Sequence, residues 1–288
     1  MTAPSPERFH YALRTGLLFP LLLLGACSDH PDIETPQHAA PPAMGKDMTA
    51  KVTTDIADHE RAAGDPAGAI SFYRQALATN PNQPKVEVSL GMTLLQAGSP
   101  NDAADTFRKV ISRFPKDAGA LTGLGMALVQ LNQPAAALDP LRQGLAIAPD
   151  ARGYRTLGVA ENLLGQNQQA EADYTRGLAL APDDPGLSNN LGLSMALSGN
   201  FNGAIAVLRT ASTGPNATAR TRQNLALALG LAGRTAEAEQ VARMDLDEQS
   251  VRSNLTYYAV LRGMSPKERT EALLRPAAQA QIATAVAH

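Results

Sequence analysis

The chain has 288 residues, with 25 Lys and Arg against 27 Asp and Glu, so its formal net charge is −2. A balance so close to zero lacks the basic footprint of a nucleic-acid-binding protein and the basic patch that binds anionic lipid. Apolar residues make up 44% of the chain, mostly as Ala and Leu, whereas aromatic residues make up only 4% and Trp is absent. This composition favours helices that pack closely through small side chains.

The N-terminus has the pattern of an export signal. Arg8 and Arg14 precede an apolar run over residues 16–24. This run is too short to cross a bilayer, which needs about 20 residues, but it has the length of the apolar core of a secretory signal peptide. We therefore expect residues 1–26 to be removed and leave them out of the fold prediction.

Cys27 is the only cysteine in the chain, and it follows Leu24, Gly25 and Ala26. A leucine, two small residues and a cysteine in this order resemble the lipobox of bacterial lipoproteins, in which the cysteine becomes the first residue and carries lipid. A lone cysteine has no internal disulfide partner, and lipidation gives it a role. The alternatives are an ordinary signal peptide with a chance cysteine and a short membrane anchor. The resemblance implies palmitate-type acylation at Cys27 and attachment to a membrane.

Residues 27–49 are predicted to be a tether between the lipid and the folded part. Four prolines lie between residues 28 and 46, and the segment has no periodic apolar face. Proline interrupts helices, and polar, proline-rich segments behave as linkers.

From residue 50 to residue 252 the sequence repeats itself. One column of alanines recurs at spacings of 34, 34, 33, 34 and 34 residues. A Gly or Ala stands twelve residues before each alanine, and a Gly or Asn five residues before it marks a turn, because glycine takes positive φ at little cost. In the first four units a proline follows twelve residues later and ends the second helix. The alanines are Ala69, Ala103, Ala137, Ala170, Ala204 and Ala238.

This pattern resembles the tetratricopeptide repeat (TPR), a unit of 34 residues that forms two helices. The resemblance covers six units. It implies an all-α fold, a TPR solenoid of about six helix-turn-helix repeats. The sequence departs from the family at the fourth position of the unit, where a Trp is often found, but that column is variable in the family.

The C-terminal segment, residues 253–288, is predicted to cap the last repeat, since a repeat stack needs an end that water tolerates. An apolar stripe predicts a helix that begins near residue 247 or 248 and ends at Arg262. Ser265 and Glu268 form a capping box for one more short helix, which Pro276 would end before a frayed tail. The stripe consists of Val251, Leu255, Tyr258 and Leu261.

The sequence contains no convincing catalytic set. The histidines are scattered, and no nucleophile elbow, phosphate-binding loop or zinc-binding helix motif occurs. A cluster of Asp55, Asp58, His59 and Glu60 is interpreted as the solvated face of the first helix. We expect a protein that is not an enzyme, with no cofactor, no metal, no nucleic acid and no small-molecule substrate.

The TPR resemblance implies a groove for protein partners. In TPR arrays the first helix of each unit lines the inner surface at positions two, five, six, nine, twelve and thirteen. Amides suit such a surface because they offer both a donor and an acceptor. Hydrogen bonding between helices inside the stack is the alternative. The predicted groove residues are Asn189, Asn190, Gln223, Asn224, Arg155 and Asn162.

Repeats two and three present a more apolar stretch at the same positions. Its methionines suit varied partners, but the simpler interpretation is that these side chains belong partly to the core. The stretch consists of Val88, Met92, Met126 and Val129.

Residues 222–234 and 253–262, together with the lipobox, resemble the TadD family of TPR lipoproteins in Flp (tight-adherence) pilus assembly. The resemblance implies a non-enzymatic scaffold on the periplasmic face of the outer membrane, with protein partners such as the pilus secretin. Ser28, rather than Asp, follows Cys27, which favours the outer membrane by analogy with lipoprotein sorting. The alternatives are a periplasmic TPR adaptor for cell-wall enzymes or type IV pili, and a binding subunit of an enzyme complex.

Overall fold

The computed structural model describes residues 45–274, which form fourteen helices and no strand. The predicted all-α fold is therefore confirmed for this part of the chain. The helices are α1 (Lys46–Ala63), α2 (Pro66–Thr79), α3 (Pro84–Gln96), α4 (Pro100–Arg113), α5 (Ala118–Gln130), α6 (Pro134–Ile147), α7 (Ala151–Leu163), α8 (Asn167–Leu180), α9 (Pro185–Ser198), α10 (Phe201–Thr213), α11 (Ala219–Leu231), α12 (Thr235–Ala242), α13 (Glu248–Arg262) and α14 (Pro266–Leu274).

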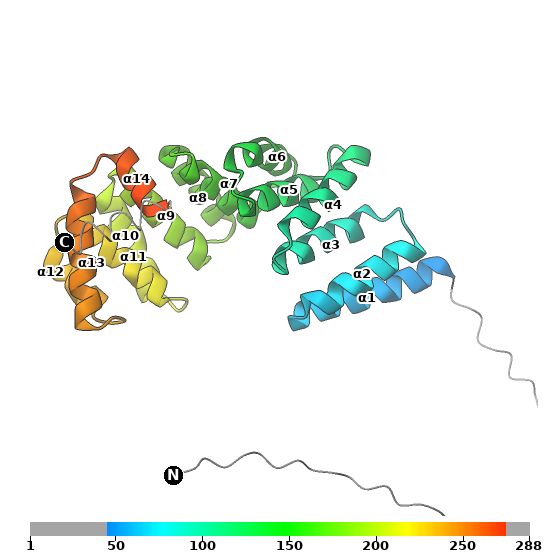
Figure 1. Ribbon diagram of the computed structural model, residues 1–288, viewed down its shortest axis with the longest axis horizontal. Helices are drawn as coiled ribbons and strands as arrows, with labels where there is room; N and C mark the ends of the chain where they lie inside the picture. The colour runs from blue at the N-terminus through cyan, green and yellow to red at the C-terminus, as the bar shows by residue number, and fades with distance from the viewer. Residues whose placement is uncertain (1–44, 275–288) are drawn as a thin grey trace, which may run out of the picture. The chain divides into compact units, whose positions relative to one another are not determined.

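The first twelve helices form six helix pairs, repeats one to six, and each pair packs on the next in chain order. Figure 1 shows these pairs side by side from α1 (blue) to α12 (yellow). From α3 to α11, the first helix of each repeat also touches the first helix of the following repeat. One face of the stack is therefore built from first helices.

The turn inside each helix pair has a left-handed residue at the predicted position. Five of these residues are glycines, and Gly64 and Gly199 have φ values of 86° and 93°. The sixth is Asn132 at φ 56°, the only residue other than glycine with positive φ among the described residues. Asparagine is among the residues that tolerate this region. The predicted turn column is confirmed in all six repeats.

Small residues set the distance between the two helices of a pair. All six alanines of the predicted column are buried, with 0% exposure. A methyl group added to Gly91 would lie 2.6 Å from the ring of Phe107, and one added to Gly192 would clash with Leu208. Phe107 and Leu208 are themselves fully buried. The space that the small side chains leave is therefore filled by a large side chain from the partner helix.

The helix α1 begins earlier than predicted. Residues 46–49, assigned to the tether from the sequence, form its first turn. Asp47 stabilises this turn, because a carboxylate favours the N-terminal end of a helix and its Oδ1 accepts a hydrogen bond of 2.9 Å from the Asn80 side chain at the end of α2. The rest of the predicted tether, the signal peptide and Cys27 lie outside the described residues.

The capping helices agree with the sequence prediction. Asp247 caps α13 and accepts a hydrogen bond from the Ser250 backbone N–H at 2.8 Å. Ser265 and Glu268 form the predicted reciprocal capping box at the start of α14, with bonds of 2.8 and 3.3 Å. α13 packs on α11 and α12, and α14 packs on α7, α9 and α13. Pro276 and the predicted tail lie outside the described residues.

Arg269 on α14 connects this helix to the stack. Its side chain is buried at 4% exposure and donates to the backbone carbonyls of Ala196 and Leu197, at 3.2 and 3.3 Å, at the end of α9. It also donates to the carbonyl of Met264 at 3.0 Å and stacks on the ring of Phe201 at 5.1 Å. Burial lowers the pKa of Arg269. A cation suits this place, because carbonyl groups at a helix C-terminus carry partial negative charge.

The interior of repeat four holds two buried carboxyl groups. Glu161 is 1% exposed and accepts a hydrogen bond of 3.0 Å from Arg142 through Oε1, while its Oε2 has no hydrogen-bond partner among the described residues. Asp173 is 4% exposed and accepts from Arg176 at 2.6 Å. Burial raises the pKa of Glu161 from 4.5 to about 7, Arg142 opposes this shift, and the Asp173 carboxyl adds to it.

Enlarging a residue of the alanine column should destabilise the stack. Ala204→Leu adds volume where no space exists, and such overpacking costs about 1–3 kcal/mol. The control is Gln168→Leu, at an exposed position of α8. Unfolding free energies from urea denaturation should fall clearly for the first variant and little for the second, and equal values for both would contradict the observed packing.

Removing the charge at Glu161 should stabilise the protein at alkaline pH. The folded state holds the Glu161 proton more tightly than the unfolded state, so stability falls as the pH rises from about 4.5 to about 7 and stays lower above that range. Glu161→Gln removes this loss, which is on the order of 3 kcal/mol, and its amide still accepts from Arg142.

The measurement is thermal unfolding at about pH 5 and about pH 8. Glu161→Gln should raise the melting temperature mainly at the higher pH, and Glu60→Gln on α1 serves as the control. A change of equal size at both pH values would show that the Glu161 carboxyl does not titrate in this window.

Candidate partner-binding groove

The first helices of repeats one to five line a groove of about 640 Å³. Every residue that lines it stands at position two, five, six, nine, twelve or thirteen of its repeat. These are the positions that the TPR resemblance assigned to the inner surface. The helix period places them on one side of each first helix, while the opposite side packs in the stack.

The middle of the groove is apolar. Leu95 and Met126 are buried at 8% and 9% exposure, and the other apolar side chains are half-buried. These side chains therefore belong partly to the core, as the sequence indicated for four of them, and they also form the floor of the groove. The floor consists of Val88, Met92, Leu95, Met126, Val129 and Val159.

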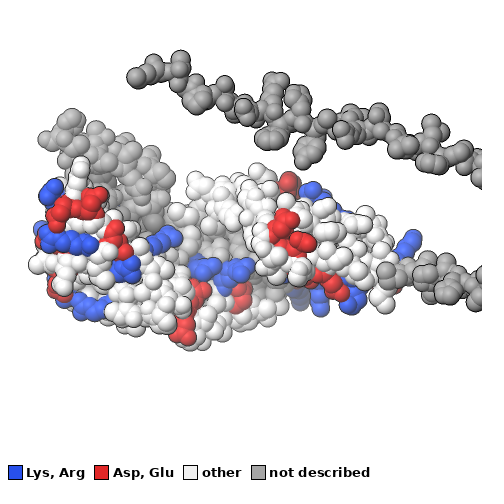
Figure 2. Space-filling view, turned by 90° about the horizontal axis from the view of Figure 1, so that it is seen from below, with Lys and Arg blue, Asp and Glu red and all other residues white. Residues whose placement is uncertain are grey.

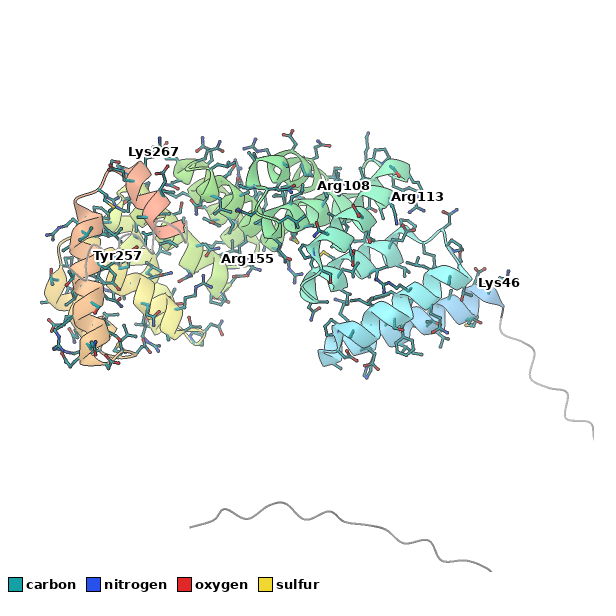
Figure 3. The ribbon with its side chains drawn as sticks, viewed as in Figure 1. Lys46, Arg108, Arg113, Arg155, Tyr257 and Lys267 are labelled. Atoms are coloured by element: carbon teal, nitrogen blue, oxygen red, sulfur yellow. The ribbon has the colours of Figure 1, made fainter. Side chains whose placement is uncertain are left out.

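Three arginines are the charged residues of the groove lining, Arg61 on α1 and Arg152 and Arg155 on α7. Arg155 forms an ion pair of 3.3 Å with Asp184, the N-cap residue of α9. Figure 3 labels Arg155 on α7 beside α9. Arg152 is exposed and has no ion pair among the described residues.

Arg61 is held at the first repeat by two neighbours. Its Nε donates to the hydroxyl of Tyr73 at 3.2 Å, and its Nη2 lies 3.4 Å from Asp58. The hydrogen bond to Tyr73 raises the pKa of Arg61, and burial raises the pKa of Tyr73. The Asp58 carboxylate also accepts from the Tyr73 hydroxyl. The Asp58 side chain is therefore directed to Tyr73 and does not line the groove.

No Asp or Glu lines the groove within the part of the chain that the structure describes. Figure 2, which views the stack from below, shows basic side chains near its middle with acidic ones beside them. The remaining lining residues are polar and uncharged. These are Ser89, Gln96, Gln130, Thr156 and Asn190.

Of the residues predicted to line the groove, the structure places two there, Arg155 and Asn190. Asn190 is half-buried in α9, and its side chain forms no hydrogen bond to another described residue. Gln223 is half-buried and lies outside the groove lining.

The other three predicted residues hold helices together. Asn189 is buried at 5% exposure and accepts a hydrogen bond of 2.8 Å from the Asn224 side chain of the next repeat. Asn162 is buried at 6% exposure, donates to the Tyr174 hydroxyl at 3.0 Å and accepts from Ser194 at 2.9 Å. For these residues the alternative interpretation, hydrogen bonding inside the stack, describes the structure.

Sequence reasoning missed eight of the fourteen residues that line the groove, among them Arg61, Arg152 and Val159. The signal was present, because all three stand at the same repeat positions as the predicted residues. Most of the amides named from the sequence lie in repeats five and six, whereas this groove is lined by repeats one to five. Partner binding through those amides stays a prediction. Applying the position rule equally to repeats one to four would have named these residues as well.

Two further kinds of site are absent from residues 45–274. No group of three or more His, Cys, Asp or Glu side chains could hold a metal ion there. None of the described helices combines the length and the apolar character needed to cross a membrane.

Comparison with solved structures identifies proteins with a similar fold. PilW, a type IV pilus biogenesis factor, is 22% identical with a TM-score of 0.61 over 70% of this chain and 98% of its own. Pseudomonas aeruginosa PilF is 16% identical with a TM-score of 0.60 over 72% and 97%. YrrB, a TPR protein with an unusual peptide-binding site, is 16% identical with a TM-score of 0.54 over 62% and 95%. No curated protein matched the sequence.

Family models described as tetratricopeptide repeat match residues 60–110, 88–152 and 164–218. These matches together reach just over half of the chain and fall on the helix pairs described above. The period of the sequence, the six helix pairs and the family models agree, and the chain belongs to the tetratricopeptide repeat family.

Proposed function

We propose that this chain is a non-enzymatic scaffold that binds a protein partner through the groove of repeats one to five. In this proposal it is a lipoprotein, anchored through Cys27 on the periplasmic face of the outer membrane. There it supports assembly of the Flp (tight-adherence) pilus and the biogenesis of its secretin.

The observation that carries the binding role is the groove itself. Its floor is formed by apolar residues of three consecutive repeats, and methionine side chains adapt to varied partners. Methionine and arginine are also enriched at protein–protein interfaces. The pattern of groove residues thus fits a protein segment better than a small polar molecule.

The pilus role rests on the resemblance of residues 222–234 and 253–262 to the TadD family. PilW and PilF supply a second candidate, since PilW is described as a type IV pilus biogenesis factor and both share the fold. An adaptor for type IV pili is therefore the alternative function. A deletion strain should lose Flp pili under the first function and type IV pili under the alternative.

Charges placed on the groove floor should abolish the scaffold function. Met92 and Val129 are half-buried and face the groove, so Met92→Glu with Val129→Glu should leave the protein folded and remove the apolar contact. We expect loss of surface Flp pili and a lower secretin level at normal abundance of the variant. Ile147→Glu, at a side chain with 50% exposure outside the groove, is the control.

Normal piliation with normal secretin in the double variant would contradict the groove assignment. If deletion of the gene also leaves Flp pili unchanged, the proposed role in tight-adherence pilus assembly is wrong. Loss of type IV pili in the same strain would then favour the alternative adaptor.

Lipid attachment predicts the behaviour of a Cys27→Ser variant. The variant lacks the thiol that carries the lipid, so the protein should remain unprocessed or leave the membrane fraction. Fractionation and the electrophoretic mobility of the mature chain measure this, with Ser28→Ala as the control. Normal processing and full membrane retention of Cys27→Ser would overturn the anchor, and recovery in the inner membrane alone would overturn the proposed location.

A further inference from the structure

The charge of the groove differs from that of the whole chain. The chain has a formal net charge of −2, whereas the charged side chains that line the groove, within the described part of the chain, are three arginines. Arg61 is paired with Asp58 and Arg155 with Asp184, so the unpaired positive charge of the lining lies at Arg152. Charge arranged in this way selects partners of opposite sign, because complementary potentials speed encounter and disfavour like-charged partners.

Arg152 and Arg155 are placed to receive a carboxylate. They lie three residues apart on α7, so their side chains share one side of that helix. Arg155 is held by Asp184 at 3.3 Å, whereas Arg152 is exposed and has no ion pair among the described residues. The guanidinium group of Arg152 thus has its full donor set open to a ligand, and arginine binds carboxylates with two parallel hydrogen bonds.

The apolar floor lies next to these arginines. Val159 stands one helical turn after Arg155 on α7, and Met126 and Val129 come from the neighbouring α5. A ligand that reaches Arg152 therefore also covers aliphatic side chains. Neither a purely acidic nor a purely apolar segment satisfies both parts of the surface.

We infer that the occupant of the groove is an acidic, apolar segment of a partner protein. Its aliphatic side chains lie on the floor between α3, α5 and α7, and a Glu or Asp side chain pairs with Arg152. This inference rests on the proposed function and adds the chemistry of the partner to it.

The chain itself offers one competing occupant. The predicted tether contains Asp29, Asp32 and Glu34 around a single Ile33. One large aliphatic side chain among three carboxylates is a poor match for a floor made by six apolar side chains, so we assign the groove to a separate partner. Replacing the three acidic residues by their amides tests this point.

The test uses a labelled synthetic peptide of leucine, methionine and glutamate and two counterparts, in which every glutamate is replaced by glutamine or by lysine. Fluorescence anisotropy with the purified full chain measures Kd. Hydrogen bonds to charged groups contribute enough that the glutamine peptide should bind about tenfold more weakly than the glutamate peptide. The lysine peptide should not bind, and added salt should weaken the glutamate peptide.

Arg152→Glu is the decisive variant, because no interaction with another described residue is lost. It should weaken the glutamate peptide about tenfold or more and allow the lysine peptide to bind. Arg74→Glu on α2 is the matched control, since Arg74 is also exposed and lies outside the groove lining. It makes the same change of net charge and should leave both affinities unchanged.

Equal binding of the glutamate and glutamine peptides, or equal effects of Arg152→Glu and Arg74→Glu, would overturn the inference and leave the apolar groove of the proposed function intact. Failure of all three peptides to bind would also overturn it. The groove of the proposed function is contradicted only if Met92→Glu with Val129→Glu leaves piliation and the secretin level normal in cells. Tighter peptide binding after neutralising the tether would make the tether the occupant and overturn the assignment to a separate partner.

Discussion

Close approach of two helices through small side chains is the constraint on which the repeats depend. Where Gly91 faces Phe107, no larger side chain fits, and the alanine column is buried without exposure. Repeats two to five make this contact at the same positions, with Leu141, Tyr174 and Leu208 in the place of Phe107. Their first helices therefore present equivalent positions to the same side of the stack. The groove follows from that regularity, since its residues are those that the packing leaves on one side of successive first helices.

The first helices of repeats two to four differ from those of repeats five and six in the side chains that they present to the groove side. In repeats two to four the side that faces the groove carries valine, methionine and leucine side chains, which form no hydrogen bonds with one another. Between repeats five and six, the Asn224 side chain donates a hydrogen bond to Asn189 across the helix interface. An amide that already has a partner offers less to a ligand, because a ligand must replace that bond before gaining another.

The sequence was sufficient for the parts of the fold that local chemistry determines. The turn residues, the alanine column and the capping box at Ser265 each follow from a backbone conformation or a contact that only certain residues allow. Contacts distant in sequence were not predictable in this way. Nothing near Arg269 indicates that its guanidinium reaches carbonyl groups at Ala196 and Leu197, and the family positions alone do not separate a groove asparagine from an interior one such as Asn162.

Several buried polar groups lie at repeat four, next to the groove. Asn162 links Tyr174 to Ser194 across two repeats, and Glu161 lies beside Asp173 with an unpaired oxygen. Leaving a buried polar atom unpaired costs free energy, whereas aliphatic residues at these sites would pack without that cost. Repeat four also supplies Arg152 and Arg155 to the groove. The hydrogen bonds of Asn162 fix α7 relative to α8 and α9, so the interior network sets the position of these two arginines in the groove.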